Sequence, residues 1–342
     1  MFKLCEWENP TVDIVPLFET INDLDVCSNV MQVVYNNKDY RSHLKLRNDT
    51  QVIMLGFSDG TKDGGYLTAN WSILKAKELL TKLSRKYGIK VIFFDGRGGP
   101  PARGGGNTHQ FYSALGNLVE SDQIQITVQG QTISSNFGTI DSCQYNLEQL
   151  LSSGVKNRII SDKEIFSRNH RKTLDKLSSI SYQAYSDFKD HPKFVPYLDK
   201  MSTIKYYAKT NIGSRPSKRG ANDSKFDFSS LRAIPFVGSW SQLKQNVPGF
   251  YGVGTALKYY SDKKEFSKIK KLYRNSPFFR TLISKSMMSL AMRRGNCRTL
   301  SWATSRRLRR WWRRSGALVV QGWKRWRLTR LGLAVRIYAP WT

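Results

Sequence analysis

The chain has 342 residues, of which 40% are hydrophobic and 24% are charged, a composition typical of a globular protein with a sizeable core. Its net charge of +29 is unusually high. About half of that charge falls in residues 292–342, which contain 14 lysines and arginines, six of the nine tryptophans and no acidic residue. No stretch is apolar for long enough to cross a bilayer, and the start carries no recognisable secretory signal. We therefore expect a protein without a membrane span.

The four cysteines are too widely spaced to predict a disulfide framework: Cys5, Cys27, Cys143 and Cys297. None of them has a second cysteine or a histidine at the spacing of a zinc site. Cysteines that form neither a disulfide framework nor a metal site are typical of proteins in a reducing compartment. We therefore expect the protein to be cytoplasmic.

Three apolar runs, each followed by a polar or glycine-rich turn, predict buried parallel strands: residues 12–18, 51–57 and 90–94. Between the second and third runs, residues 66–87 repeat apolar side chains at helical spacing, and Gly88 is placed to end that helix. A strand, a helix and a strand of these lengths form a crossover unit, which predicts a parallel sheet or barrel. Residues 124–128 extend the pattern as a fourth apolar run.

After about residue 140 the pattern becomes mainly helical. Residues 170–189 place five apolar side chains on one helix face: Leu174, Leu177, Ile180, Ala184 and Phe188. Residues 211–230 are polar and rich in Gly, Ser and Lys, which indicates a loop. Residues 263–288 predict one further basic amphipathic helix.

Charged residues follow the ends of the predicted strands: Glu19, Asp59, Asp95 and Arg97. In a (β/α) barrel the corresponding ends meet at one face, where catalytic groups collect. The carboxylates of Glu19 and Asp59 suit a hard divalent cation, which takes oxygen ligands. The alternative is that each carboxylate caps the helix that follows it. Spacing alone leaves both interpretations open.

Residues 95–106 form a glycine-rich segment that contains Arg97 and Arg103. Glycines let backbone N–H groups approach an anion, and arginines supply donors that match phosphate or carboxylate oxygens. The alternative is a flexible basic loop that binds RNA nonspecifically. Because the segment directly follows an apolar strand, a small phosphorylated ligand is favoured. Thr108 is expected to cap the helix that comes next.

Three further cations are candidates for anion binding. Lys62 lies in a turn that lacks the residue order of a nucleotide-binding phosphate loop, so it is either an anion ligand or a solvated lysine. Arg215 lies in the polar loop. Arg232 has apolar neighbours, where a charge is costly unless it is paired with an acid or bound to an anion.

In their order and spacing, six motifs resemble the phosphoenolpyruvate carboxylase family: VPLFET (15–20), LGFSDGTKDGGYLTANW (55–71), FDGRGGPPARGGG (94–106), GSRPSKR (213–219), SLRAIPF (230–236) and GVGTAL (252–257). The resemblance runs from about residue 10 to about residue 290. It implies an α/β fold in which residues 1–140 belong to a helix-rich TIM-like (β/α) barrel. Residues 141–291 would form a mainly helical continuation.

The resemblance also implies a carboxy-lyase that converts phosphoenolpyruvate and bicarbonate to oxaloacetate and phosphate, through carboxyphosphate and a metal-stabilised enolate. Glu19 and Asp59 would hold Mg²⁺ (or Mn²⁺), and Lys62 would help to hold bicarbonate or the substrate. The remaining catalytic residues would be four arginines. Phosphate groups would be bound by Arg97, Arg215 and Arg232. Arg103 would serve both the active site and an inhibitor site. Full-length members would form homotetramers.

The sequence departs from the family at several points. Asp95 stands where the family commonly has histidine, and Pro100, Pro101 and Ala102 replace smaller residues of the glycine-rich loop. Family enzymes are far longer, and their N-terminal half, with a catalytic histidine motif, and their extreme C-terminus have no counterpart here. We therefore expect a fragment without activity of its own.

Residues 292–342 resemble nothing in the family. Arginines and tryptophans without acids are typical of translation in a shifted reading frame, so we expect a disordered tail that binds polyanions nonspecifically. The alternative is a functional segment that binds membranes or nucleic acid. For the whole chain, the second hypothesis is a basic nucleic-acid-binding protein that uses residues 95–106 and the tail. The charges outside the tail follow strand ends rather than one surface, which favours the carboxylase.

Overall fold

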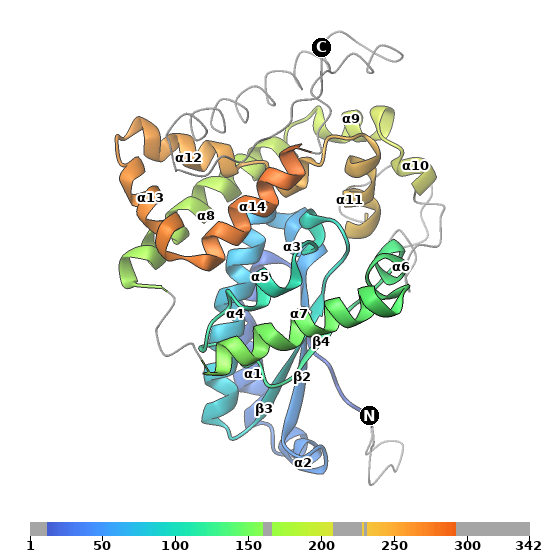
Figure 1. Cartoon of the computed structure of the whole chain (residues 1–342), viewed down its shortest axis with the longest axis vertical. Coiled ribbons are helices and arrows are strands. Elements are labelled where there is room, and N and C mark those ends of the chain that lie inside the picture. The colour runs from blue at the N-terminus through green and yellow to red at the C-terminus, as the bar shows by residue number, and fades with distance from the viewer. Residues whose placement is uncertain (1–11, 160–165, 208–227, 229–230, 292–342) are drawn as a thin grey trace. The chain divides into compact units, whose positions relative to one another are not determined.

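The structure is a computed structural model that describes residues 12–159, 166–207, 228 and 231–291 (Figure 1). These residues divide into two compact units. The first unit takes its described residues from 1–63, 69–99 and 104–165, and the second from 64–68, 100–103 and 166–342. Arg215, most of the predicted polar loop and the tail at 292–342 lie outside the described residues.

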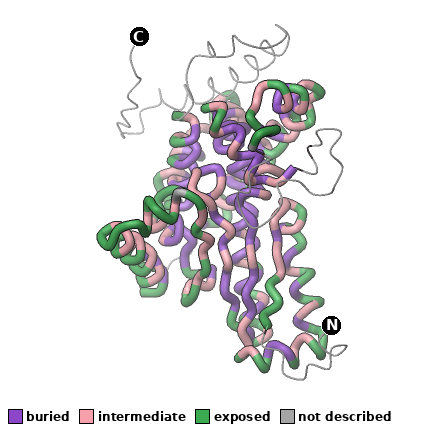
Figure 2. Tube along the Cα trace, turned by 90° about the vertical axis from the view of Figure 1, so that its right-hand side faces the viewer, coloured by how far each residue is buried: buried purple, intermediate pink, exposed green. Residues whose placement is uncertain are grey.

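The first unit is built on a four-stranded parallel sheet with strands in the order β1-β2-β3-β4: Leu17–Phe18, Thr50–Gly56, Lys90–Gly96 and Ile124–Ile126. Because all strands run in the same direction, their carboxyl ends lie along one edge. Figure 2 shows buried residues along the paired strands, as expected for a parallel sheet covered by helices. The predicted α/β fold class is confirmed.

The first strand is shorter than the predicted residues 12–18. Its pairing begins after Pro16, whose carbonyl oxygen accepts a hydrogen bond from the Met54 N–H at 2.9 Å. Proline has no N–H group to donate, so it cannot form a full rung of the ladder. Only Leu17 and Phe18 pair with β2 as a strand.

Among the described residues, seven helices connect or follow these strands: α1 (Ile21–Asn36), α2 (Lys38–Leu46), α3 (Phe57–Gly64), α4 (Tyr66–Lys86), α5 (Thr108–Tyr112), α6 (Gln131–Phe137) and α7 (Ile140–Ile159). The predicted helix at 66–87 is α4, and Gly88 ends it with a φ of +65°. The Ile89 N–H bonds to the Ser84 carbonyl at 2.9 Å, which completes a glycine-terminated helix end. The cap of α5 is Asn107 rather than the predicted Thr108, since the Asn107 side chain accepts the Gln110 N–H.

The described residues of the second unit are mainly helical: α8 (Arg168–Lys189), α9 (Phe194–Met201), α10 (Ile204–Tyr207), α11 (Ala233–Gln242), α12 (Val253–Asp262), α13 (Phe266–Asn275) and α14 (Pro277–Ala291). Aromatic side chains fill its core. Phe188 stacks on Tyr251 with ring centroids 4.3 Å apart, and Trp240 is fully buried beside them.

Two sequence predictions for this unit need correction. The single helix predicted at 263–288 is two helices, because Ser276 adopts an extended backbone and Pro277 starts α14. The buried face of α8 includes Ser181 and Tyr185, whereas Ile180 and Ala184 are half-buried. The buried face of α8 is therefore rotated slightly from the predicted apolar face, and polar side chains form part of it.

Within the part of the chain that the structure describes, no helix is long and apolar enough to cross a membrane. Cys27 and Cys143 are free cysteines in this part. Burial raises the pKa of the Cys27 thiol to about 11, so this cysteine is not a reactive thiolate at neutral pH.

Candidate active site at the carboxyl edge of the sheet

Glu19 and Asp59 lie on segments that pack tightly against each other. Glu19 follows β1, and Asp59 lies in the first turn of α3, which starts directly after β2. A Cβ atom at Gly56 would lie 2.5 Å from the Glu19 Cβ, and a Cβ atom at Gly60 would lie 3.4 Å from the Glu19 carbonyl oxygen. Glycines on both sides of Asp59 therefore allow the Glu19 backbone to approach α3 closely.

The capping interpretation is wrong for Glu19. Thr20 is the N-cap of α1, since its hydroxyl accepts the Asp23 N–H at 3.1 Å and the Asp23 carboxylate accepts the Thr20 N–H at 2.9 Å. This reciprocal capping box satisfies the start of α1 without the Glu19 side chain. Asp59 is the third residue of α3, so it is not the N-cap of that helix either.

The far end of α3 contacts the same turn. The Asp63 carboxylate accepts the N–H of Ile21, the first residue of α1, at 3.0 Å. Lys62 precedes Asp63 and is half-buried. The junction between β1 and α1 is therefore contacted by α3 at Gly60 and at Asp63, the residues next to Asp59 and Lys62 in the chain.

Two carboxylates at neighbouring strand ends fit a divalent cation by their chemistry, because both offer hard oxygen ligands. No group of three or more His, Cys, Asp or Glu side chains suited to a metal occurs among the described residues. A cation here would therefore take the rest of its coordination shell from water and substrate, as Mg²⁺ commonly does.

Arg97 lies one strand further along the edge. Gly96, the last residue of β3, pairs in register with Gly56 of β2. The Arg97 side chain is only 4% exposed, and its Nε and Nη2 both donate to the Gly104 carbonyl oxygen. Its guanidinium carbon lies 4.5 Å from the centroid of the Phe111 ring. The arginine is thus fixed by the glycine-rich loop and by α5.

Asp95 is fully buried and bound by two side chains from neighbouring helices. Lys77 Nζ of α4 lies 2.8 Å from each carboxylate oxygen of Asp95, and the Tyr112 hydroxyl of α5 donates to Oδ2 at 2.7 Å. Burial lowers the pKa of the Lys77 ammonium, an effect that the Asp95 carboxylate opposes. Burial likewise raises the pKa of the Tyr112 hydroxyl well above its usual value.

Sequence reasoning missed both partners of Asp95. Lys77 could have been found, because it lies three residues after Leu74 and three before Leu80, on the apolar stripe of the predicted helix. A lysine in that position is buried, and a buried cation needs a carboxylate. Tyr112 carried no comparable signal in the sequence.

The two ends of the glycine-rich loop that belong to the first unit, residues 95–99 and 104–106, pack closely against each other. A Cβ atom at Gly105 would lie 1.7 Å from the Gly99 carbonyl oxygen, so only glycine fits. Gly104 has a φ of +84° and offers its carbonyl oxygen to Arg97. A closely packed turn of this kind differs from the flexible RNA-binding loop considered as an alternative.

Replacing Gly105 by alanine is expected to destabilise the chain by about 1–3 kcal/mol, because the new methyl group must displace backbone atoms. The matched control is Gly154→Ala in α7, where the nearest atom that a Cβ would meet is 4.0 Å away. That change should stabilise the helix by about 0.5–1 kcal/mol. Urea unfolding measures both, and equal effects of the two substitutions would contradict the close approach.

Two other candidate residues, Arg103 and Arg232, belong to the second unit. Arg103 ends a short 3-10 helix, Pro101–Arg103, and is half-buried. Arg232 is the N-cap residue of α11, and its Nε is buried without a hydrogen-bond partner in the described residues. No ion pair of Arg232 occurs within those residues, so the salt-bridge alternative has no partner there.

The comparisons with known proteins decide the family. The family model described as phosphoenolpyruvate carboxylase matches residues 2–294. A phosphoenolpyruvate carboxylase of Nitrosomonas eutropha (strain DSM 101675 / C91 / Nm57) is 37% identical over 299 residues, which cover 85% of this chain and 32% of that protein. The chain belongs to the phosphoenolpyruvate carboxylase family. It spans about a third of the length of the curated relative it matches.

The extent of the family match agrees with the break in composition. The match ends at residue 294, so nearly all of the basic tail lies beyond it. Nothing in the comparisons supports the alternative of a nucleic-acid-binding protein. Three of the six carboxylase motifs, at 15–20, 55–71 and 94–106, contain residues that follow strands at the carboxyl edge of the sheet.

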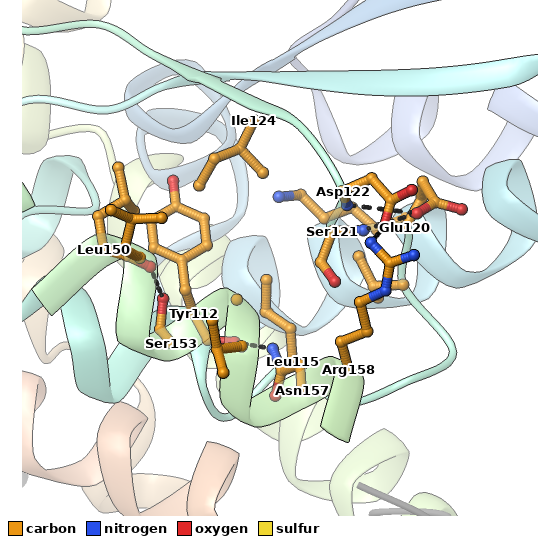
Figure 3. A pocket seen from close by; sticks show the side chains of 15 residues that line it. Tyr112, Leu115, Glu120, Ser121, Asp122, Ile124, Leu150, Ser153, Asn157 and Arg158 are labelled. Carbon is orange, nitrogen blue, oxygen red and sulfur yellow. Dashed lines mark hydrogen bonds and ion pairs between the residues drawn. The ribbon is translucent and has the colours of Figure 1, made fainter. Parts of the chain in front are cut away.

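A separate pocket of about 310 Å³ lies in the first unit, between α7 and the segment that joins α5 to β4 (Figure 3). Leu115, Ile124 and Leu150 contribute apolar walls, and Lys77 and Tyr112 also line it. None of the carboxylase motif residues proposed for the active site lines this pocket. It is therefore distinct from the edge that carries Glu19, Asp59 and Arg97.

Proposed function

We propose that the chain is a catalytic portion of a phosphoenolpyruvate carboxylase and binds phosphoenolpyruvate at the carboxyl edge of its sheet. The observation that carries this proposal is the placement of Glu19, Asp59 and Arg97 at the ends of neighbouring parallel strands, within a family match over residues 2–294. Ligand sites in parallel α/β folds lie at these strand ends.

In the proposed reaction, the phosphoryl group of phosphoenolpyruvate passes from the enol oxygen to a bicarbonate oxygen, which gives carboxyphosphate and the enolate of pyruvate. Carboxyphosphate then breaks its carbon–oxygen bond to release CO₂ and phosphate. The enolate carbon attacks CO₂, and the new carbon–carbon bond completes oxaloacetate. Charge moves between oxygens throughout, so fixed cationic donors are the main requirement on the protein.

Arg97 is proposed to bind phosphate oxygens. A guanidinium has five N–H groups, and two of those of Arg97 are directed at the Gly104 carbonyl oxygen. Its guanidinium also interacts with the Tyr112 hydroxyl, and the N–H groups that remain are proposed to donate to an anion. Because the side chain is buried, each such charge-assisted hydrogen bond is stronger than it would be in water.

Glu19 and Asp59 are proposed to hold a divalent cation, with Mg²⁺ or Mn²⁺ as the expected metals. When bound, such a cation supplies Lewis-acid polarisation of substrate oxygens. Lys62, which precedes Asp63 on α3, is proposed to orient bicarbonate or phosphoenolpyruvate.

Arg232, Arg215 and Arg103 are proposed as further anion-binding residues. The buried Nε of Arg232 is a donor that an anionic ligand would satisfy. Arg215 lies in the motif GSRPSKR at 213–219. Arg103 is proposed to serve the active site and an inhibitor site. A homotetrameric, cytoplasmic enzyme is the corresponding proposal for the full-length protein.

A metal titration tests the proposal directly. Mn²⁺ binding to the chain, followed by water-proton relaxation, is expected to weaken at least tenfold in Asp59→Asn and in Glu19→Gln, because each change removes one of two charged ligands. Asp25→Asn is the matched control, since Asp25 is an exposed carboxylate on α1. Unchanged Mn²⁺ affinity in Asp59→Asn would remove the metal assignment.

A further inference from the structure

The buried ion pair of Lys77 and Asp95 has no role in the function described so far. The side chain of Lys77 is 1% exposed and that of Asp95 is 0% exposed. Two charges removed from water at this cost rarely stabilise a fold more than apolar side chains of the same volume would. A pair of this kind is therefore a candidate for a functional role.

Arg97 is the second cation beside this carboxylate. It follows Asp95 by two residues, and its N–H donates to the Asp95 carbonyl oxygen at 2.8 Å. Its guanidinium carbon lies 5.1 Å from the centroid of the Tyr112 ring, while the hydroxyl of the same tyrosine donates to Asp95. Tyr112 thus contacts both charged groups.

In the described part of the chain, the Asp95 carboxylate forms an ion pair with Lys77 and none with Arg97. An Arg97–Asp95 pair would use the guanidinium donors that an anionic ligand needs, because arginine binds a carboxylate through two parallel N–H groups. The choice of counter-ion for Asp95 therefore decides whether Arg97 can bind a ligand.

We propose that Lys77 is a positioning residue that keeps Arg97 available to the substrate by acting as the counter-ion of Asp95. Tyr112 assists, because its hydroxyl holds the carboxylate while its ring faces the guanidinium. Without Lys77, the buried carboxylate would draw in the remaining cation, and Arg97 would turn from the ligand to Asp95. This inference rests on the proposed function, in which Arg97 binds phosphate oxygens.

A purely structural ion pair makes a different prediction. If Lys77 and Asp95 only stabilise the fold, anion affinity follows the folded fraction and does not depend on which charge is removed. If Lys77 keeps Asp95 away from Arg97, affinity falls when the lysine alone is removed. It then recovers when the carboxylate is removed as well, because Arg97 no longer has a competing partner.

The probe is sulfate, a tetrahedral dianion with no proton to exchange between pH 6 and 8, titrated calorimetrically into the full chain. Lys77→Met is expected to weaken sulfate binding at least tenfold, and Lys77→Met with Asp95→Asn is expected to return it to within threefold of the parent. Arg97→Ala is the control for the proposed function and should remove the binding. Equal affinities of the parent and Lys77→Met, or no recovery in the double variant, would overturn the role of Lys77.

Two measurements keep the test decisive if Lys77→Met folds poorly or if the parent binds no sulfate. Asp95→Asn alone leaves Lys77 in place and is expected to retain affinity within threefold, whereas a tenfold loss would show that the carboxylate itself serves the ligand. In urea unfolding, Arg97→Met should reduce the folding equilibrium constant at least tenfold more in the Lys77→Met background than in the parent. Equal reductions contradict the proposal whether or not sulfate binds, whereas a parent without sulfate affinity contradicts only the proposed function.

Discussion

The purified chain is expected to form no detectable oxaloacetate from phosphoenolpyruvate, bicarbonate and Mg²⁺. It spans 32% of the length of the Nitrosomonas eutropha relative, and the described residues contain a parallel sheet of four strands. A TIM-like barrel closes with eight strands, and its pocket is built from the loops after all of them. The side chains proposed to bind phosphate are therefore expected to bind it without completing the reaction, because water exclusion and proton transfer are expected to require the remaining wall.

A coupled malate dehydrogenase assay measures this outcome, with Lys62→Ala as the matched background. Turnover of the parent chain above that background would show that the four-stranded sheet suffices, and the fragment hypothesis would fail. Addition of a separately expressed N-terminal portion of a family member is expected to restore activity. Restored activity that disappears again in Arg97→Ala would show that this chain contributes its own arginine to the site.

The periodicity of the sequence was sufficient to predict the sheet and its main crossover. The runs at 51–57 and 90–94 became β2 and β3, and the amphipathic stretch between them became α4, ended by Gly88. Burial on both faces makes such strands continuous in apolar residues, so the pattern is strong. Because Asp59 and Arg97 come shortly after these runs in the sequence, both could be predicted to lie at the carboxyl edge of the sheet.

Contacts between distant residues could not be predicted in the same way. The close approach of Glu19 to Gly56 depends on the pairing of β1 with β2 over two residues, which a seven-residue apolar run did not reveal. Tyr112 reaches Asp95 from a five-residue helix whose sequence shows no periodicity. The break between α13 and α14 had a local signal in Pro277, but the amphipathic pattern on both sides obscured it.

Deletion of residues 292–342 is expected to abolish most of the affinity of the chain for polyanions such as heparin or single-stranded DNA. The segment carries 14 cationic side chains and no anionic ones, so nothing within it neutralises them. Each cation that contacts a phosphate or sulfate releases a counter-ion, which makes the affinity fall steeply as salt rises. Its six tryptophans add stacking surfaces for bases. The chain without residues 292–342 should therefore bind heparin or single-stranded DNA only weakly between 50 and 200 mM salt, and that weak affinity should depend little on salt.

A partial deletion provides the matched control for this prediction. Removal of residues 317–342 takes away five of the 14 cations, so the slope of log affinity against log salt should fall by about a third rather than vanish. The family match ends at residue 294, and the motif residues all precede it, so neither deletion should alter Mn²⁺ binding. The thermal midpoint of the remaining chain should change by less than about 2 °C, which corresponds to about 1 kcal/mol for a protein of this size. A decrease of several degrees would show that the segment packs against the carboxylase portion, and the shifted-frame interpretation would then be wrong.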